Sequence, residues 1–432
     1  MSARPAAPRL LPAAEVLFEA ADGGHEGLDA LAAALGIGSG PVRADHLRYK
    51  PDRTVVGRLN ADDGAPVGWV AGFGPAAADK AAGAWRLGEK LGIDLPALDL
   101  GGGHLLIAGP VGADKKLRRL LRRTRSVRAD GSVRGEILNF NPGRRLVVRR
   151  RGPVEDVAIS GPDGDVVVKL SHRAYGHIED LTSALRACGV PALQPHPMAG
   201  AQDHGLVFEH YGTGDLSAGG TADEFEQAGH LLRRWHAAGA SVAAVTALPR
   251  LDASARLRAV VSGIEGILPE AADRARRVAA DLNEALAAAG GADVPVHGDY
   301  SADQLLRGPA GLRIIDADRA AWGPPGWDLG CFAAAELLAV ADGRPRRLDG
   351  TENMLHGYGG VESVPAFVGA HVLLRALEPF RAADPRWAER VSGRLALAER
   401  LAAAPAAGGP AALTDAMTAA HAGPAHSLRG KP

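Results

Sequence analysis

The sequence predicts an α+β protein in which a small antiparallel sheet separates an N-terminal α/β domain from a helical C-terminal region. Strand-like segments with turn residues between them cover residues 46–71 and 136–170. Apolar residues at helical spacing cover residues 14–36 and most of the chain after residue 331. Strands that precede a long run of helices, instead of alternating with them, are typical of the α+β class.

Composition limits the size and the partners of the protein. The 432 residues are enough for roughly three structural units of about 150 residues each. The 49 basic and 50 acidic residues give a formal net charge of -1, so no overall field selects nucleic acid or an anionic membrane as a partner. Cys188 and Cys331 lie in apolar helical contexts and are expected to be buried, reduced thiols of a cytoplasmic protein.

No targeting segment is expected. The first 21 residues contain early prolines and no unbroken apolar core, which argues against a secretory signal. No segment offers about 18 consecutive apolar residues free of charge and proline, so a soluble protein without a membrane partner is expected. The basic stretch from Arg118 to Arg128 has leucines behind its arginines, which favours a solvated helix face over a nucleic-acid site. The oligomeric state is left open.

The N-terminal region contains a hairpin that is repeated more weakly later in the chain. An aromatic-x-Pro-x-Arg turn joins β-rich arms at residues 46–59 and again at residues 137–150. The repeat suggests two similar hairpins, the first in an N-terminal domain and the second at the start of the next domain. A boundary near residue 130 is therefore expected.

The second hairpin opens a region of three predicted strands, at residues 136–141, 145–150 and 165–170. Pro162, Asp163 and Gly164 give a turn signal before the third strand. That strand ends at Lys169-Leu170, and a helix over residues 175–187 follows it.

The strongest functional signal is His297-Gly298-Asp299 followed by Gln304 and, after a short turn, by Asp316. An aspartate with an amide residue five positions later reproduces the spacing of a protein-kinase catalytic loop, with Gln in place of Asn. The loop supplies a proton acceptor and an oxygen ligand for Mg²⁺, and Asp316 adds a carboxylate ligand from the next hairpin strand. Phosphoryl transfer from Mg-ATP needs this combination of groups.

The stretch from Val296 to Gly330, VHGDYSADQLLRGPAGLRIIDADRAAWGPPGWDLG, resembles the core of the aminoglycoside phosphotransferase and choline kinase-like superfamily. Its His-Gly-Asp-Tyr-x-x-x-Gln form is similar to the maltokinase and glucosamine kinase branch of actinobacteria. Maltokinase-type proteins usually carry a Glu-Gly-Glu-Pro-like run after the second metal aspartate. Here the run is Asp318-Arg319-Ala320-Ala321, which argues against maltose itself as the substrate.

The resemblance implies a bilobal protein kinase-like fold preceded by a cap domain. The expected units are a cap at residues 1–130, an N-lobe at 131–212, a helical C-lobe at 213–422 and a disordered tail at 423–432. The implied activity is transfer of the γ-phosphate of ATP, with Mg²⁺, to a hydroxyl of a small polar acceptor such as a sugar, aminosugar or aminoglycoside.

The resemblance also assigns roles to individual residues. Asp299 is the expected catalytic proton acceptor, and Gln304 and Asp316 are the expected metal ligands. The expected nucleotide-binding residues are Lys169 for the phosphates, Glu179 as the partner of Lys169 with Asp180 as its competitor, and the backbone of Glu209 to Tyr211 for adenine. His297 and Asp328 are expected to brace the loop, His236 to be a packed structural residue, and Asp318 to be an auxiliary acid.

Two alternatives stay open. The single glycine in the turn at residues 141–144 and the Gln at position 304 suit a pseudokinase that binds nucleotide without turnover. The Gly-x-Gly-x-x-Ala run at residues 72–77 suits a dinucleotide-binding oxidoreductase, but the preceding residues 54–71 predict an antiparallel hairpin where that fold needs parallel strands. Three acids of the C-terminal region are candidates for a cationic aminosugar: Glu336, Asp349 and Glu352.

Overall fold

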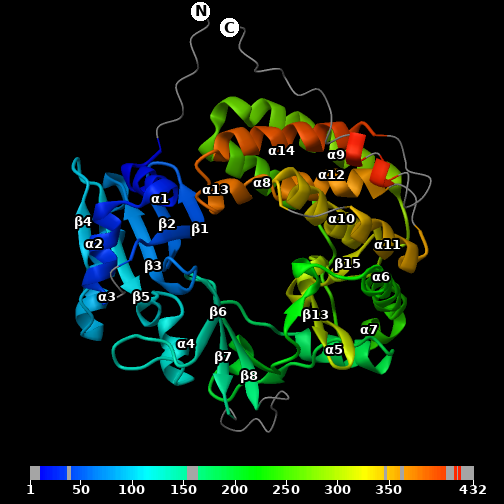
Figure 1. Ribbon diagram of the computed structural model, residues 1–432, viewed down its shortest axis with the longest axis horizontal. Helices are drawn as coiled ribbons and strands as arrows, with labels where there is room; N and C mark the ends of the chain where they lie inside the picture. Colours follow the sequence, from blue (N-terminus) through cyan, green and yellow to red (C-terminus); the bar gives the residue numbers. More distant parts are fainter. Residues whose placement is uncertain are drawn as a thin grey trace, which may run out of the picture.

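The computed structural model describes residues 10–36, 40–152, 164–344, 348–360, 364–404, 413–415 and 417–419. Figure 1 shows three parts that follow one another around a ring, from the N-terminal sheet through a second sheet to a helical region that returns to the first. Three predictions lie wholly or partly outside the described residues: the absence of a signal at the N-terminus, the turn at Pro162 and Asp163, and the tail at residues 423–432.

The first part is a five-stranded antiparallel sheet with helices packed against it. Helices α1 (Pro12–Gly23) and α2 (Glu26–Ala34) are separated at Gly24, whose φ of 93° ends the first helix. The strand order is β1-β2-β3-β5-β4. The elements of the sheet are β1 (Arg43–Lys50), β2 (Thr54–Asn60), β3 (Pro66–Phe73), β4 (Ala97–Asp99) and β5 (Leu105–Pro110), with α3 (Ala78–Leu91) after β3.

The sheet decides against the oxidoreductase alternative. Strand β3 pairs antiparallel with both β2 and β5, so Gly72 lies within a hairpin strand and Gly74 just after it, and neither follows a parallel strand. The predicted hairpin at residues 54–71 is confirmed. A dinucleotide fold binds its cofactor at the carboxyl ends of parallel strands, and this sheet has none among its described strands.

The second part is another five-stranded antiparallel sheet, in the order β6-β7-β8-β10-β9. The three predicted strands are confirmed to within one residue at each end. Its elements are β6 (Glu136–Asn141), β7 (Arg145–Arg151), β8 (Asp165–Ser171), β9 (His196–Pro197) and β10 (Gly205–Glu209), with α4 (Arg118–Arg123) before the sheet and α5 (Ile178–Ala187) after β8.

The third part is helical, with two small sheets on the side that faces the second part (Figure 1). The small sheets contain β11 (Gly214–Asp215), β13 (Leu305–Gly308) and β14 (Gly311–Ile314), and β12 (Val294–Val296) with β15 (Ala321–Gly323). The helices are α6 (Ala222–Ala237), α7 (Gly239–Val245), α8 (Ala253–Ile267), α9 (Ala272–Ala289), α10 (Gly326–Ala341), α11 (Asp349–Tyr358), α12 (Val364–Leu374), α13 (Glu378–Arg381) and α14 (Trp387–Ala402).

The helix predicted at residues 365–381 is divided into two in the structure. The apolar pattern at residues 365–381 suggests a continuous helix, but α12 ends at Leu374 and α13 begins at Glu378. Pro379 has no N–H to donate to the carbonyl of Arg375, and its ring would collide with that carbonyl in a continuous helix. The Arg375 carbonyl instead accepts a hydrogen bond from the guanidinium of Arg394 on α14.

An aromatic cluster closes the ring between the first and third parts. Phe18 of α1 and Tyr49 of β1 meet the ring of Phe380 on α13 with centroid distances of 5.2 and 5.7 Å. Trp387 of α14 packs at 5.1 Å from Phe380 and 6.0 Å from Phe18. The N-terminal sheet therefore contacts the helical region directly, besides preceding the second sheet in the chain.

The predicted α+β class, with two lobes and a preceding domain, is confirmed. The boundaries near residues 130 and 212 stay predictions; they fall between Pro110 and Glu136 and just after Glu209. Cys331 is buried as expected, whereas Cys188 is exposed at the end of α5, so the prediction of a buried thiol there is wrong. No helix among the described residues is long and apolar enough to cross a membrane.

Candidate active site

The loop that carries Asp299 is held by a buried carboxylate at the start of α10. Asp328 accepts hydrogen bonds from the backbone N–H groups of His297 at 2.7 Å and Gly298 at 2.8 Å. His236 of α6 lies 3.0 Å away through Nε2, and its Nδ1 lies 2.9 Å from the Tyr358 hydroxyl. Burial alone would raise the pKa of Asp328, but the hydrogen bond and charge of His236 outweigh it and lower that pKa. The predicted bracing by Asp328 and packing of His236 are confirmed.

The same loop approaches the segment that carries the second aspartate. Gly298 has a φ of 82°, and a Cβ there would lie 2.2 Å from the carbonyl oxygen of Arg319, so only glycine fits. The His297 Nε2 lies 2.8 Å from the carbonyl oxygen of Ile315. The turn between Asp299 and β13 and the turn after β14 are therefore fixed against each other.

Asp299 lies among cationic side chains. Its carboxylate is 3.2 Å from Nη1 of Arg319 and 3.9 Å from Nη2 of Arg375, and its side chain is 30% exposed. The Cys331 thiol lies 4.0 Å away, and burial raises the pKa of that thiol to about 12, so it stays neutral. Asp299 is thus an accessible carboxylate, oriented by two guanidinium groups.

A second cluster forms around Lys169 at the end of β8. The buried lysine places Nζ 2.6 Å from Asp316 Oδ1 and 2.6 Å from Asp318 Oδ2. Arg145 of β7 lies 3.2 Å from Asp316 and 3.9 Å from Asp318. The third strand of the second sheet and the turn after β14 therefore meet at this cluster.

The two aspartates reach one lysine through a turn and not through a regular strand. β14 ends at Ile314, Asp316 takes the left-handed conformation with φ 64°, and residues 317–319 form a single 3-10 turn. A non-glycine residue in this conformation is uncommon and is characteristic of functional sites. The turn brings Asp318 back toward Lys169, so the auxiliary acid contacts the lysine as directly as Asp316 does.

The pKa values of the two carboxyl groups are shifted in opposite directions. Burial acts to raise the pKa of Asp316, but Lys169 and Arg145 outweigh it and hold that pKa well below its usual range. Burial and the negative charge of Asp316 raise the pKa of Asp318. A pair of close carboxyl groups with separated pKa values is a common feature of functional sites.

Gln304 ends the 3-10 turn just before β13, and its backbone is hydrogen-bonded to the residue before Asp316. Its carbonyl oxygen accepts from the N–H of Ile315 at 3.0 Å, and its side-chain nitrogen donates to Asp303 at 2.8 Å. Its side-chain oxygen Oε1 is buried and has no hydrogen-bond partner among the described residues. An unpaired buried amide oxygen and an ionised carboxylate, here on two hydrogen-bonded segments, are oxygen ligands of the kind that Mg²⁺ prefers. No three His, Cys, Asp or Glu side chains of the described ranges form a metal-binding group on their own.

The expected pair between Lys169 and Glu179 is not formed. Glu179 is exposed in the first turn of α5, and Lys169 instead pairs with Asp316 and Asp318. Tyr175, just before the helix, takes the place beside the lysine, with Nζ 5.3 Å from its ring centroid. Because α5 begins at Ile178 and not at residue 175, Glu179 lies in its first turn, which leaves the carboxylate at the surface.

The segment expected to bind adenine leaves β10 at Glu209. The N–H of His210 donates to the Asp165 carbonyl at 3.2 Å. In an antiparallel pair, successive residues direct their backbone groups alternately toward and away from the partner strand. The N–H and C=O groups of Glu209 therefore point away from β8. Strand β9 pairs with β10 at Leu206 and Val207, before this point. The Tyr211 hydroxyl donates to the Gly311 carbonyl at 2.7 Å and ties the segment to the β13–β14 hairpin.

The turn between β6 and β7, at the position of a kinase glycine-rich loop, is bound by the N-terminal part. The Pro142 carbonyl accepts from the Arg48 guanidinium, and the Gly143 N–H donates to the buried Asp114 carboxylate. The next residue, Arg144, lies among other arginines: burial first, and then the charges of neighbours that include Arg173 and Arg319, lower its pKa. Cationic side chains thus gather where the sequence offers a single glycine.

Three acids proposed for a cationic acceptor do not line a common pocket. Glu336 is buried and accepts from the Thr351 hydroxyl at 2.6 Å, and Glu352 is exposed on α11. None of Glu336, Asp349 and Glu352 lines the pocket of about 650 Å³ that lies next to the Asp299 loop. The prediction that they face the acceptor is therefore not supported by their positions.

Several residues of the site carry no signal in the sequence. Arg145, Arg319 and Arg375 reach the aspartates from three separate segments. In a chain rich in arginine, no local pattern separates these three from arginines on the surface. For Arg319 the sequence offers one indication of a place in the site: it follows Asp318 directly, so it must lie on the same turn as that acid.

Comparison with known proteins finds a family match for part of the chain and several similar solved structures. Residues 154–363 match the model of the phosphotransferase enzyme family. No curated protein sequence matches the chain. A choline/ethanolamine kinase family protein from Mesorhizobium loti is similar in structure, with a TM-score of 0.45 and 16% identity over 71% of this chain and 99% of that chain.

Two further solved structures are similar. An amicoumacin kinase in complex with AMP-PNP and Ca²⁺ gives a TM-score of 0.48 and 13% identity over 66% of this chain and 95% of that chain. An aminoglycoside phosphotransferase from Streptomyces rimosus in complex with ADP and streptomycin gives a TM-score of 0.41 and 18% identity over 60% of this chain and 98% of that chain. The sequence of residues 154–363 is thus similar to that of the phosphotransferase enzyme family.

Proposed function

We propose that the protein is an ATP-dependent phosphotransferase that phosphorylates a hydroxyl group of a small molecule. One observation carries the proposal: the Asp299 loop, braced by Asp328, is fixed at the His297–Ile315 contact to the turn whose Asp316 and Asp318 hold Lys169. The proposed proton acceptor, oxygen ligands and phosphate-binding cation are thus carried by segments that contact one another.

Asp299 accepts the proton of the acceptor hydroxyl. As the acceptor oxygen forms a bond to the γ-phosphorus, the bond from that phosphorus to the β,γ-bridging oxygen breaks, and ADP leaves with the electron pair. Arg319 and Arg375 orient the Asp299 carboxylate. General-base action by a positioned carboxylate contributes roughly 10²–10⁴-fold to such a rate.

The negative charge of ATP is met by the cationic groups of the second sheet. Lys169 is buried at the cluster, and Arg145 stands beside it. Arg144 and Arg319 add charge at the turn that replaces a glycine-rich loop. Guanidinium groups bind phosphate oxygens in a bidentate manner, so this turn can hold a polyphosphate by side chains where a glycine-rich loop uses backbone N–H groups.

Gln304 and Asp316 are the proposed ligands of Mg²⁺, with Asp318 close by. When bound, the ion would neutralise phosphate charge and polarise the transferred group. Glu209 and Tyr211 would contribute backbone groups to the adenine. Glu179 has no role in this proposal, since it does not reach Lys169.

The domain boundaries at residues 130, 212 and 422 are proposed as they were expected from the sequence. The maltokinase and glucosamine kinase branch is a further proposal, supported by the His-Gly-Asp-Tyr-x-x-x-Gln motif alone. The Asp318-Arg319-Ala320-Ala321 run contributes to the Lys169 and Asp299 contacts here. That use of the run argues against an acceptor site like that of a maltose kinase.

The test is ADP release from Mg-ATP in the presence of sets of hydroxyl compounds. At least one set should raise ADP release well above the rate with water alone, and removing Mg²⁺ with a chelator should abolish the increase. If the protein binds Mg-ATP but no set raises ADP release, the nucleotide-binding pseudokinase is the correct description.

A further inference from the structure

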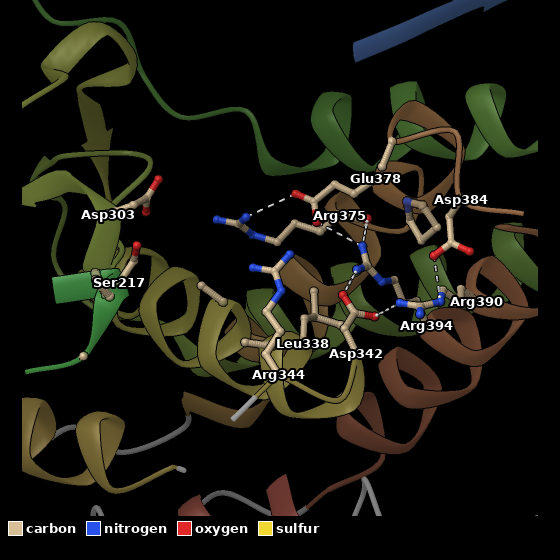
Figure 2. A pocket seen from close by; sticks show the side chains of 17 residues that line it. Ser217, Asp303, Leu338, Asp342, Arg344, Arg375, Glu378, Asp384, Arg390 and Arg394 are labelled. Atoms are coloured by element: carbon tan, nitrogen blue, oxygen red, sulfur yellow. Dashed lines mark hydrogen bonds and ion pairs between the residues drawn. The ribbon is translucent and has the colours of Figure 1, made fainter. Parts of the chain in front are cut away.

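A pocket of about 650 Å³ lies beside the Asp299 loop (Figure 2). Its wall includes Ala302 and Asp303 of that loop, the end of α10, and parts of α13 and α14. Arg375 lines the pocket and also lies 3.9 Å from Asp299, so the pocket adjoins the proposed proton acceptor. Its volume is typical of sites for small molecules.

Every carboxylate of the wall already has a donor. Asp342 accepts hydrogen bonds from Arg390 and Arg394, each at 2.9 Å, and Glu378 accepts from Arg375 at 3.1 Å and from the same Arg394 at 3.0 Å. Asp384 lies 2.9 Å from a guanidinium nitrogen, and Asp303 accepts from Ser301 at 2.5 Å and Gln304 at 2.8 Å. The guanidinium partners are Arg375, Arg390 and Arg394. A cationic ligand would have to displace one of these donors.

Arg344 differs from the other arginines of the wall. It is exposed, follows the end of α10, and forms no ion pair with any other described residue. Figure 2 shows its guanidinium group directed into the pocket, toward the region where the side chain of Arg375 ends. The charges of Arg375, Arg390 and Arg394 are balanced by those of Asp342, Glu378 and Asp384, and Asp303 is held by neutral donors. Arg344 is thus the arginine that the described wall offers to a ligand without a carboxylate partner.

We propose that the acceptor carries an anionic group, a carboxylate or a phosphate, which Arg344 binds while the acceptor hydroxyl faces Asp299. This inference rests on the proposed function and names its substrate class. A guanidinium group pairs with either anion through two parallel hydrogen bonds. A neutral sugar would leave Arg344 without a partner, and an aminosugar or aminoglycoside would bring its charge against it.

The test compares four sets of acceptors that differ in charge: sugar acids and hydroxy acids, sugar phosphates, neutral sugars and polyols, and amino sugars and amino alcohols. ADP release gives kcat and KM for the best member of each set. One of the two anionic sets should give the highest kcat/KM, and which of them does so identifies the anion.

Variants at position 344 supply the second part of the test. Arg344→Glu should raise KM for the best anionic acceptor about 10- to 100-fold with kcat nearly unchanged, because a charge-assisted contact to the ground state and transition state is lost equally. Arg344→Lys should keep most of the affinity. Arg258→Glu, on the exposed face of α8, makes the same charge change away from the pocket and should leave KM unchanged.

Two results would overturn the inference while leaving the kinase proposal intact. One is the highest kcat/KM with a neutral or cationic acceptor. The other is an anionic acceptor whose KM is the same for Arg344→Glu and the unaltered protein. Absence of ADP release with all four sets, from protein that binds Mg-ATP, would instead overturn the proposed function itself and the inference with it.

Discussion

Asp316 and Asp318 contact the same lysine, yet their pKa values are shifted in opposite directions. Asp316 has a lowered pKa because Lys169 and Arg145 outweigh its burial, while burial and the charge of Asp316 raise the pKa of Asp318. The ionised Asp316 is therefore suited to bind a cation, and Asp318 is the group that changes protonation more readily as the pH falls toward the acidic range.

This difference predicts unequal effects of the same substitution at the two positions. Asp316→Asn removes the ionised oxygen ligand and should lower kcat with Mg-ATP by about 10²-fold or more, in keeping with loss of a charge that stabilises the transition state. Asp318→Asn leaves Asp316 and Lys169 paired and should cost about 10-fold or less. Steady-state kinetics at saturating acceptor compares the two variants, and equal losses would contradict the assignment.

His371 makes the stability depend on pH. It is buried on α12 with its ring 4.4 Å from that of Trp327, and burial lowers its pKa to about 3 from 6.5. Below pH 6.5 the unfolded chain binds a proton at His371, whereas the folded protein does not bind one there until about pH 3. In this range each unit by which the pH is lowered therefore reduces the free energy of unfolding by up to about 1.4 kcal/mol.

We predict that His371→Phe reduces this dependence. Chemical denaturation at pH 7 and pH 5 should show a smaller loss of unfolding free energy for the variant than for the unaltered protein. The interval lies above the usual range of carboxyl pKa values, so it separates the histidine from the acids. An equal loss in both proteins would show that His371 is protonated in the folded state.

At the scale of elements, α6 and α11 approach each other through glycine. A Cβ at Gly229 would lie 2.0 Å from the Met354 carbonyl oxygen, and one at Gly357 would lie 2.0 Å from that of Glu226. The same two helices carry His236 and Tyr358, whose side chains are in contact. The close contact of the helices thus supports the histidine that holds Asp328.

Gly229→Ala should therefore reduce both stability and activity. Forcing a methyl group into this contact should cost about 1–3 kcal/mol of unfolding free energy and displace His236 from Asp328, lowering kcat. Gly393→Ala on α14 is the matched control, because a Cβ there meets no atom within 4 Å. The control should gain about 0.5–1 kcal/mol by reducing the freedom of the unfolded chain. Denaturant unfolding and steady-state kinetics on both variants provide the check.

Elements with a local signature could be predicted from the sequence. The strands of the second sheet contain β-branched or aromatic residues and have turn residues between them, and the Asp299 loop has a fixed spacing, so both are specified over a few residues. The break between α12 and α13 could also have been predicted from the sequence, because Pro379 lies inside the apolar pattern. Proline removes a helical hydrogen bond wherever it occurs in a helix interior.

Contacts that depend on tertiary structure could not be predicted in this way. The Lys169 partner was expected to be Glu179, because family resemblance fixes the order of elements but not the start of α5. Arg344 and Arg375 enter the pocket from the ends of different helices. Their function depends on which carboxylates they meet, and that information is distributed over the whole helical region.

At the scale of the whole molecule, adjacent residues of one strand touch two distant parts of the site. Arg48 of β1 donates to the Pro142 carbonyl in the turn at residues 141–144, while Tyr49 packs against Phe380 of α13. Helix α13 also supplies Glu378 to the pocket. The N-terminal sheet thus spans the nucleotide side and the acceptor side of the proposed site.

We predict that the contact between the N-terminal sheet and the helical region stabilises the whole protein. A double-mutant cycle on Phe18→Ala and Phe380→Ala should give a coupling free energy of about 0.5–1.5 kcal/mol, as expected for an edge-to-face ring pair. Phe18→Ala combined with Phe140→Ala, on the second sheet, should be additive. Unfolding in two separate steps, with no coupling between Phe18 and Phe380, would show that the N-terminal sheet is independent.

The most direct test of the site is transfer of radiolabelled γ-phosphate in a single turnover, with the best acceptor found, by the unaltered protein and by Asp299→Asn. The variant should bind Mg-ATP as before and transfer the label roughly 10²–10⁴-fold more slowly, since it lacks the group that takes the hydroxyl proton. Transfer by Asp299→Asn at the rate of the unaltered protein would contradict the assignment of Asp299 as the proton acceptor and the site built around it.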